Sequence, residues 1–120
     1  MPAKRKRYPI CRTADLLSGQ RKIVDLDGRS VGVFNVNGQY FALHNRCPHT
    51  AAPLCLGLLT GTTLPSDDFQ YHYGREGYIL RCAWHGWEFD IETGQSLFDP
   101  KYKARTFRVA VENENVVVYI

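Results

Sequence analysis

The chain has 120 residues, 44% of them hydrophobic and 22% charged, and a formal net charge of +3. This length suits one compact domain and is too short for two ordinary ones. Two Trp, seven Tyr, six Phe and ten Gly are typical of a turn-rich globular domain and exclude a collagen-like, coiled-coil or low-complexity chain. No apolar run approaches the roughly 20 residues of a membrane helix, so we expect no membrane partner.

The N-terminus is basic, with Lys or Arg at each of positions 4–7. No apolar segment follows, so no secretory signal is predicted and the expected location is the cytoplasm. Clustered basic residues could contact nucleic acid or an acidic partner, but a solvated tail is the simpler interpretation. We therefore expect residues 1–7 to be a basic tail that binds no nucleic acid, and residues 8–120 to form a single domain.

The first half of this domain alternates with a period of two, which predicts β-strands at residues 21–26, 30–36 and 39–44. Asp27-Gly28 and Asn37-Gly38 separate these strands. Such pairs supply the positive φ that tight hairpin turns demand, so we expect three strands joined by two hairpins.

Later strands are predicted at residues 78–81, 88–91, 105–112 and 116–120. Turns are expected between neighbours at residues 92–95 and 113–115. Residues 15–19 form at most one helical turn, so the predicted fold class is all-β. Residues 60–77 show no clear period and are interpreted as an irregular insertion.

Four Cys and four His occur in the chain. Without a secretory signal, Cys and His at short spacing indicate a metal site rather than disulfides. Cys47 and His49 follow one predicted strand, and Cys82 and His85 follow another. The remaining Cys11 and Cys55 have no His at ligand spacing and are expected to be buried small apolar residues.

The spacing of these pairs bears on the kind of metal. A tetrahedral zinc normally takes ligand pairs separated by two to four residues, whereas only Pro48 separates Cys47 from His49. The pair is better explained if its members bind different metal ions. Two thiolates would then hold one iron of a two-iron cluster and two imidazoles the other. A structural zinc module for protein interaction, using the same four ligands, remains an alternative.

The motif extends beyond the four ligands. Cys47-x-His49 followed by Cys82-x-x-His85-Gly86, Trp87-x-Phe89-Asp90 and Thr93-Gly94 resembles the Rieske [2Fe–2S] motif. The resemblance is closest to the ferredoxins of bacterial ring-hydroxylating oxygenase systems. Residues 33–43 resemble the hairpin of that family before its first loop, and residues 52–54 resemble its first-loop exit. The resemblance covers residues 8–120.

The resemblance implies the Rieske fold, an antiparallel β-sandwich with a small subdomain of two cluster-binding loops. It implies one [2Fe–2S] cluster, with Cys47 and Cys82 on the buried iron and His49 and His85 on the outer iron. It also places four further residues around the cluster, namely Pro53, Trp84, Gly86 and Trp87. The two loops lie further apart in sequence than in compact ferredoxins, and residues 60–77 account for the extra length.

The implied function is one-electron transfer from an NAD(P)H-dependent flavoprotein reductase to a non-haem iron oxygenase, each bound transiently. The chain is not expected to be an enzyme on its own. A mononuclear oxygenase iron needs two His and a carboxylate, and only His44 and His72 remain after the ligands are assigned. The small subunit of an assimilatory nitrite reductase resembles the same architecture and stays an alternative. A redox-sensing module is a further one.

The residues around the motif also bear on its potential. High-potential respiratory members of the family carry Ser and Tyr where this chain has Trp87 and Phe89, and a disulfide between the positions of Ala52 and Trp84. Hydrogen bonds to the cluster sulfurs raise the potential, and Trp87 and Phe89 have no hydroxyl to donate. We therefore expect a potential on the order of −150 mV.

Overall fold

A computed structural model describes residues 6–48, 53–65, 71–82, 87–97, 99 and 101–120. In chain order the elements are β1 (Arg7–Arg12), η1 (Thr13–Asp15), β2 (Arg21–Leu26), β3 (Arg29–Val36), β4 (Gln39–His44), η2 (Leu54–Leu56), β5 (Leu58–Pro65), β6 (Tyr71–Arg81), β7 (Glu88–Asp90), β8 (Thr106–Glu112) and β9 (Asn115–Tyr119). The elements η1 and η2 are 3-10 helices of three residues each. Within the described ranges no helix has the length and apolar character to cross a membrane. The all-β fold class is confirmed.

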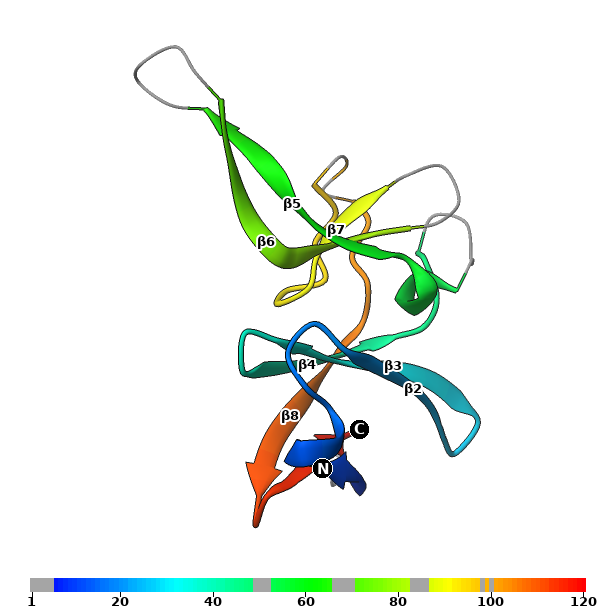
Figure 1. Cartoon of the computed structure of the whole chain (residues 1–120). Helices are drawn as coiled ribbons and strands as arrows, with labels where there is room; N and C mark the ends of the chain where they lie inside the picture. Colours follow the sequence, from blue (N-terminus) through cyan, green and yellow to red (C-terminus); the bar gives the residue numbers. More distant parts are fainter. Residues whose placement is uncertain (1–5, 49–52, 66–70, 83–86, 98, 100) are drawn as a thin grey trace.

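Two antiparallel sheets build the molecule (Figure 1). The larger sheet has six strands in the order β1-β9-β8-β4-β3-β2, and the smaller sheet has three in the order β5-β6-β7. The larger sheet forms the lower part of the view, and the ribbon of β5 and β6 projects from the upper part. Strand β4 leads into the first Cys/His segment and β6 into the second, so the two segments follow strands of different sheets.

The hairpins of the larger sheet match the sequence prediction. Strands β2, β3 and β4 pair in register through Arg21↔Phe34 and Val36↔Gln39. Both turns have positive φ at each central residue, with 53° and 87° in Asp27-Gly28 and 52° and 87° in Asn37-Gly38. Asn and Asp tolerate this backbone region better than other residues with a side chain, which is why the sequence locates the turns so well.

Strand β1 was not predicted, and its pairing changes the interpretation of the tail. The backbone of Lys6 exchanges two hydrogen bonds with Ile120, at 2.9 and 3.0 Å, and Arg7 lies opposite Tyr119. The expectation of a solvated tail is therefore wrong for Lys6 and Arg7. Without β1, strand β9 would be an edge strand with unpaired backbone N–H and carbonyl groups. Strand β1 forms hydrogen bonds with these groups. Residues 1–5 lie outside the described residues.

The segment predicted to be irregular contains most of two strands, so this expectation is wrong. Strand β5 pairs with β6 from Leu58↔Arg81 to Pro65↔Tyr71, with a register irregularity between Thr60 and Thr62. The outer part of this ribbon has few apolar residues and two glycines on β6, so it lacks the alternation from which strands are predicted. That the segment is an insertion relative to the family stays a prediction.

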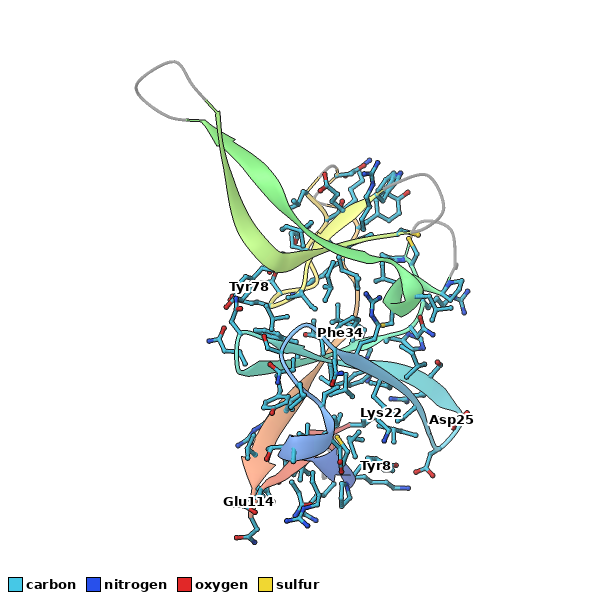
Figure 2. All side chains as sticks on the ribbon, in the orientation of Figure 1. Tyr8, Lys22, Asp25, Phe34, Tyr78 and Glu114 are labelled. Carbon is cyan, nitrogen blue, oxygen red and sulfur yellow. The ribbon has the colours of Figure 1, made fainter. Side chains whose placement is uncertain are left out.

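Two apolar clusters hold the fold together. One joins the sheets and includes Phe34 of β3, Leu80 of β6 and Phe89 of β7, each fully buried. Phe34 lies in the middle of the molecule, between the two sheets (Figure 2). The second cluster lies within the larger sheet and includes Val31, Val33 and Val116. The first cluster is the one that reaches the Cys/His segments.

Candidate metal centre

The two cysteines of the motif lie in one apolar cluster. Cys47 follows the end of β4 by three residues, and Cys82 follows β6 directly. Each is 1% exposed, and both belong to the cluster that joins the sheets. The structure thus brings together two buried sulfur atoms from segments that are far apart in the sequence.

Several predicted site residues lie outside the described residues: His49, Trp84, His85 and Gly86. Pro53 is exposed where the first loop ends, and Trp87 is half-buried where the second ends. Among the described residues no group of three or more His, Cys, Asp or Glu is placed to hold a metal ion. The described part of the proposed site is therefore its cysteine half.

A side chain closes the base of the first loop. The Oδ1 atom of Asn45 accepts a hydrogen bond from the backbone N–H of Cys55, at 2.7 Å. Its Nδ2 atom donates to the Oγ atom of Ser30 on β3, at 3.1 Å. Asn45 thereby ties the entry of the loop to its exit and to the larger sheet.

Arg21 of β2 fixes the loop exit from the other side. Its Nη1 atom donates to the carbonyl of Cys55, at 2.9 Å, and to the carbonyl of Gly57. Its guanidinium lies 5.3 Å from the centroid of the Phe34 ring, an arrangement that favours a cation. One charged side chain thus holds two backbone carbonyls of the segment that leads away from Cys47.

Gly57 packs the exit of the first loop against the strand that precedes Cys82. A Cβ atom built on Gly57 would lie 2.0 Å from the carbonyl oxygen of Arg81. Only glycine permits this approach, because such a contact would force the two backbones apart. The exit of the first loop therefore packs against the residue before Cys82, which sets the distance between the two loops.

The second loop is closed by backbone and by an aromatic contact. The N–H of Cys82 donates to the carbonyl of Trp87, at 2.7 Å, across residues 83–86. The Trp87 ring meets Tyr102 edge to face, with centroids 5.1 Å apart and planes at 88°. Such pairs contribute about 0.5–1.5 kcal/mol beyond the buried area. The exit of the second loop is thus anchored to the segment before β8.

The other two cysteines differ in burial. Cys55 is fully buried, its Sγ atom donates to the carbonyl of Leu43 at 3.5 Å, and burial raises its pKa to about 12. Its expected role as a small buried residue is confirmed. Cys11 is half-buried and packs against the second cluster, and partial burial raises its pKa. Sequence alone gave no signal to separate these two thiols.

The described residues fit half of a [2Fe–2S] site. Cysteine thiolates are the ligands that iron–sulfur clusters take, and Cys47 and Cys82 are both buried in the apolar cluster that joins the sheets. Two loops with closed bases hold them without help from a disulfide between Cys11 and Cys55, which both remain thiols. Burial of this kind also tunes the potential of a cluster.

Comparison with known proteins decides the family. The model of the Rieske [2Fe–2S] domain matches residues 6–119. The chain belongs to the Rieske [2Fe–2S] domain family. Membership implies one Rieske-type [2Fe–2S] cluster, so the cofactor expected from the motif is confirmed at the level of the family.

Curated relatives of this Rieske chain fall into two groups by length. Human apoptosis-inducing factor 3 is 34% identical over 110 residues, which are 91% of this chain but 16% of that protein. The chain therefore spans about a sixth of that relative. The ferredoxin component of the p-cumate 2,3-dioxygenase system from Pseudomonas putida is 31% identical over 111 residues, 91% of this chain and 81% of that protein.

Solved structures share the fold of this Rieske chain. The ferredoxin of carbazole 1,9a-dioxygenase from Nocardioides aromaticivorans superposes with a TM-score of 0.74 and 22% identity, over 93% of this chain and 95% of that one. A ferredoxin in complex with the oxygenase of carbazole 1,9a-dioxygenase gives the same TM-score, with 24% identity, over 94% and 92%. The Rieske fold expected from the motif is therefore confirmed.

Proposed function

We propose that the chain is a one-electron carrier whose [2Fe–2S] cluster is held by Cys47, Cys82, His49 and His85. The two cysteines would bind the inner iron and the two histidines the outer one. The observation that carries this proposal is the burial of Cys47 and Cys82 in one apolar cluster, each at the start of a loop closed at its base. A bound cluster would supply one-electron chemistry and no reaction on an organic substrate.

The proposed circuit runs in the cytoplasm from an NAD(P)H-dependent flavoprotein reductase to a non-haem iron oxygenase of the ring-hydroxylating type. Support for the oxygenase comes from relatives that are named as ferredoxin components of dioxygenase systems. Support for a carrier without its own oxygenase iron comes from the two remaining histidines. Such an iron needs two His and a carboxylate, and of these two histidines His44 ends β4 in the larger sheet, whereas His72 lies on β6 of the smaller sheet.

The cluster is tested on the purified protein. We expect a brown protein with iron and sulfide in equal amounts and a rhombic EPR signal after reduction with dithionite. The variants Cys47→Ser, Cys82→Ser, His49→Leu and His85→Leu should each lose the cluster. Matched controls are Cys11→Ser and His44→Gln, which should keep it. A colourless protein with one zinc ion would contradict the proposal and favour the structural zinc module.

The circuit is tested separately from the cluster. Electrons from NAD(P)H should reach the holoprotein through a flavoprotein reductase and leave it for a ring-hydroxylating oxygenase, with product formed in proportion to the carrier added. Stable co-purification with a large sirohaem protein would contradict this circuit and assign the chain to a nitrite reductase instead.

A further inference from the structure

Positive charge gathers where the first loop begins. Arg46 comes directly before Cys47, and His44 ends β4 two residues earlier. The backbone N–H of His44 donates to the carbonyl of Arg105, at 2.8 Å, where β4 meets the segment that leads into β8. His44, Arg46 and Arg105, together with Arg29, form a surface that we call the basic patch.

Arg29 joins the basic patch through the pairing of β3 with β4. Val31 lies opposite His44, and the N–H of Asn45 donates to the carbonyl of Ser30 at 2.8 Å. Arg29 comes two residues before Val31 and Arg46 two residues after His44, so both arginines lie at the same end of this strand pair.

The arginines of the basic patch form no ion pair with an acidic residue of the described ranges. Arg29, Arg46 and Arg105 are all exposed. The Arg105 guanidinium lies 5.1 Å from the centroid of the Phe107 ring, which holds the group in place without cancelling its charge. Burial, and then the charges of Arg105, Arg46 and Arg29, lower the pKa of His44.

The exit of the first loop, which begins at the basic patch, carries an exposed apolar side chain. Leu56 is 61% exposed, and it follows Cys55, whose N–H is bonded to the side chain of Asn45. Arginine and apolar contacts together are typical of protein interfaces. Binding to the phosphate backbone of a nucleic acid needs only the positive charge, so the composition favours a protein.

We propose that the basic patch and Leu56 form the docking surface for an acidic protein, the redox partner of the chain. The proposal rests on the proposed function, because electron transfer requires a partner close to the cluster. The Cα atoms of Arg46 and Cys47 are about 3.8 Å apart as consecutive residues. An acidic group bound at Arg46 is therefore held at the base of a ligand loop, and opposite charges speed the encounter.

The test compares the holoprotein with the double variant Arg29→Glu/Arg46→Glu. The matched control is Arg12→Glu/Lys22→Glu, which makes the same change in net charge elsewhere. Arg12 lies on β1, and Lys22 lies in the half of the molecule away from the smaller sheet (Figure 2). Because Arg46 adjoins a proposed ligand, the single variant Arg29→Glu is included as one that leaves the loop unchanged.

Two haem proteins of opposite charge serve as probes, an acidic cytochrome b5 and a basic cytochrome c. Binding of each is measured on a biosensor at low and high ionic strength. Electron transfer is measured by mixing the reduced holoprotein with each probe, so that the cluster loses one electron and the ferric haem becomes ferrous.

We expect the wild-type protein to bind cytochrome b5 more tightly than cytochrome c. The double variant should lower the association rate for cytochrome b5 about tenfold at low ionic strength, and Arg29→Glu should lower it less. The matched control should remain within about twofold of wild type, since Arg12 and Lys22 are not among the charges that act on His44 in the patch. All differences should shrink near 1 M salt, where the Debye length is about 3 Å.

Equal losses in the double variant and the matched control would overturn the docking proposal, as would unchanged binding in the double variant. Vesicles of phosphatidylserine and a DNA duplex are tested in parallel. If the double variant loses binding to one of these and not to cytochrome b5, the patch serves a lipid surface or a nucleic acid instead. Failure of the proposed function gives a different result, because the wild-type protein would then show no [2Fe–2S] spectrum. The binding data would still show whether the basic patch binds an acidic protein.

Discussion

The side-chain carbonyl of Asn45 accepts a hydrogen bond from the backbone N–H of Cys55, at 2.7 Å, and so joins the two ends of the loop that starts at Cys47. The contact is partly buried, and the amide group of Asn45 is used a second time by Ser30. A buried N–H that loses its acceptor costs more than an exposed one, since water does not replace the bond. Retention of the cluster should therefore depend on a residue that is not a ligand.

Replacement of Asn45 tests this dependence. We expect Asn45→Ala to lower the free energy of unfolding by about 1–3 kcal/mol and to speed loss of the visible cluster absorbance in the presence of a chelator. The matched control is Asn115→Ala, because the side chain of Asn115 donates to the carbonyl of Asn113 within one exposed turn. Equal cluster lifetimes in the two variants would contradict a role for Asn45 in closing the loop.

Arg21 should resist conservative replacement. Lysine offers one compact ammonium group in place of a planar fork, and it does not stack on an aromatic ring as well. We expect Arg21→Lys and Arg21→Ala both to shorten the lifetime of the cluster, with the larger effect in Arg21→Ala. The neighbouring exposed residue gives the control Lys22→Ala, which should behave as wild type. A fully stable Arg21→Lys variant would show that positive charge alone suffices at this position.

The midpoint potential should be low for a Rieske cluster. Phe89 is fully buried and Trp87 is half-buried at the exit of the second loop, and neither offers a hydroxyl to a cluster sulfur. Hydrogen bonds to sulfur favour the reduced cluster, so their loss lowers the potential toward about −150 mV. A redox titration followed by circular dichroism measures this value, and a clearly positive midpoint would contradict the expectation.

Acid should weaken the contact between β1 and the β8–β9 hairpin. Glu112 accepts hydrogen bonds from Tyr119 and from Arg7, at 2.9 Å for the latter, and both lower its pKa below the ordinary 4.5. A lowered pKa means that the ionised carboxylate stabilises the fold at neutral pH, and that this contribution is lost as the pH falls through the folded-state pKa.

The acid effect is measured by chemical denaturation at neutral pH and at several pH values below the ordinary pKa of 4.5. We expect Glu112→Gln to be less stable than wild type at neutral pH, with a smaller difference in acid. The control Glu114→Gln removes an exposed ion pair with Arg12, and such pairs contribute little. A gap between wild type and Glu112→Gln that does not narrow in acid would contradict the role assigned to this carboxylate.

Much of the larger sheet was predictable because its signals are local. Asp27-Gly28 and Asn37-Gly38 have the backbone preferences that their turns require. Strand β3 between them points its side chains alternately to the two apolar clusters, with Val31 and Val33 in one and Phe34 and Val36 in the other. The Cys and His spacing predicted the family in the same way, since ligands on short loops must lie close together in sequence. The predicted strands placed Cys47 and Cys82 just after strand ends, and both lie there.

Strand β1 was missed because long-range pairing holds it in place, and most of β5 and the outer part of β6 were missed because they show no apolar alternation. Strand β1 is extended because β9 offers it a row of backbone partners from the other end of the chain. The ribbon of β5 and β6 carries a register irregularity and three glycines, which hide any period. Their conformation depends on a neighbour and not on their own composition.

By itself the sequence determined the all-β class, the hairpin turns, the family and the candidate ligands, because each rests on residues that are neighbours along the chain. Only the tertiary structure decided which residues close the loops and what surrounds them. Asn45, Arg21 and Gly57 act through contacts with segments that are distant in sequence. The basic patch likewise exists only because three separate segments end side by side, since charge at a surface adds up across space and not along the chain.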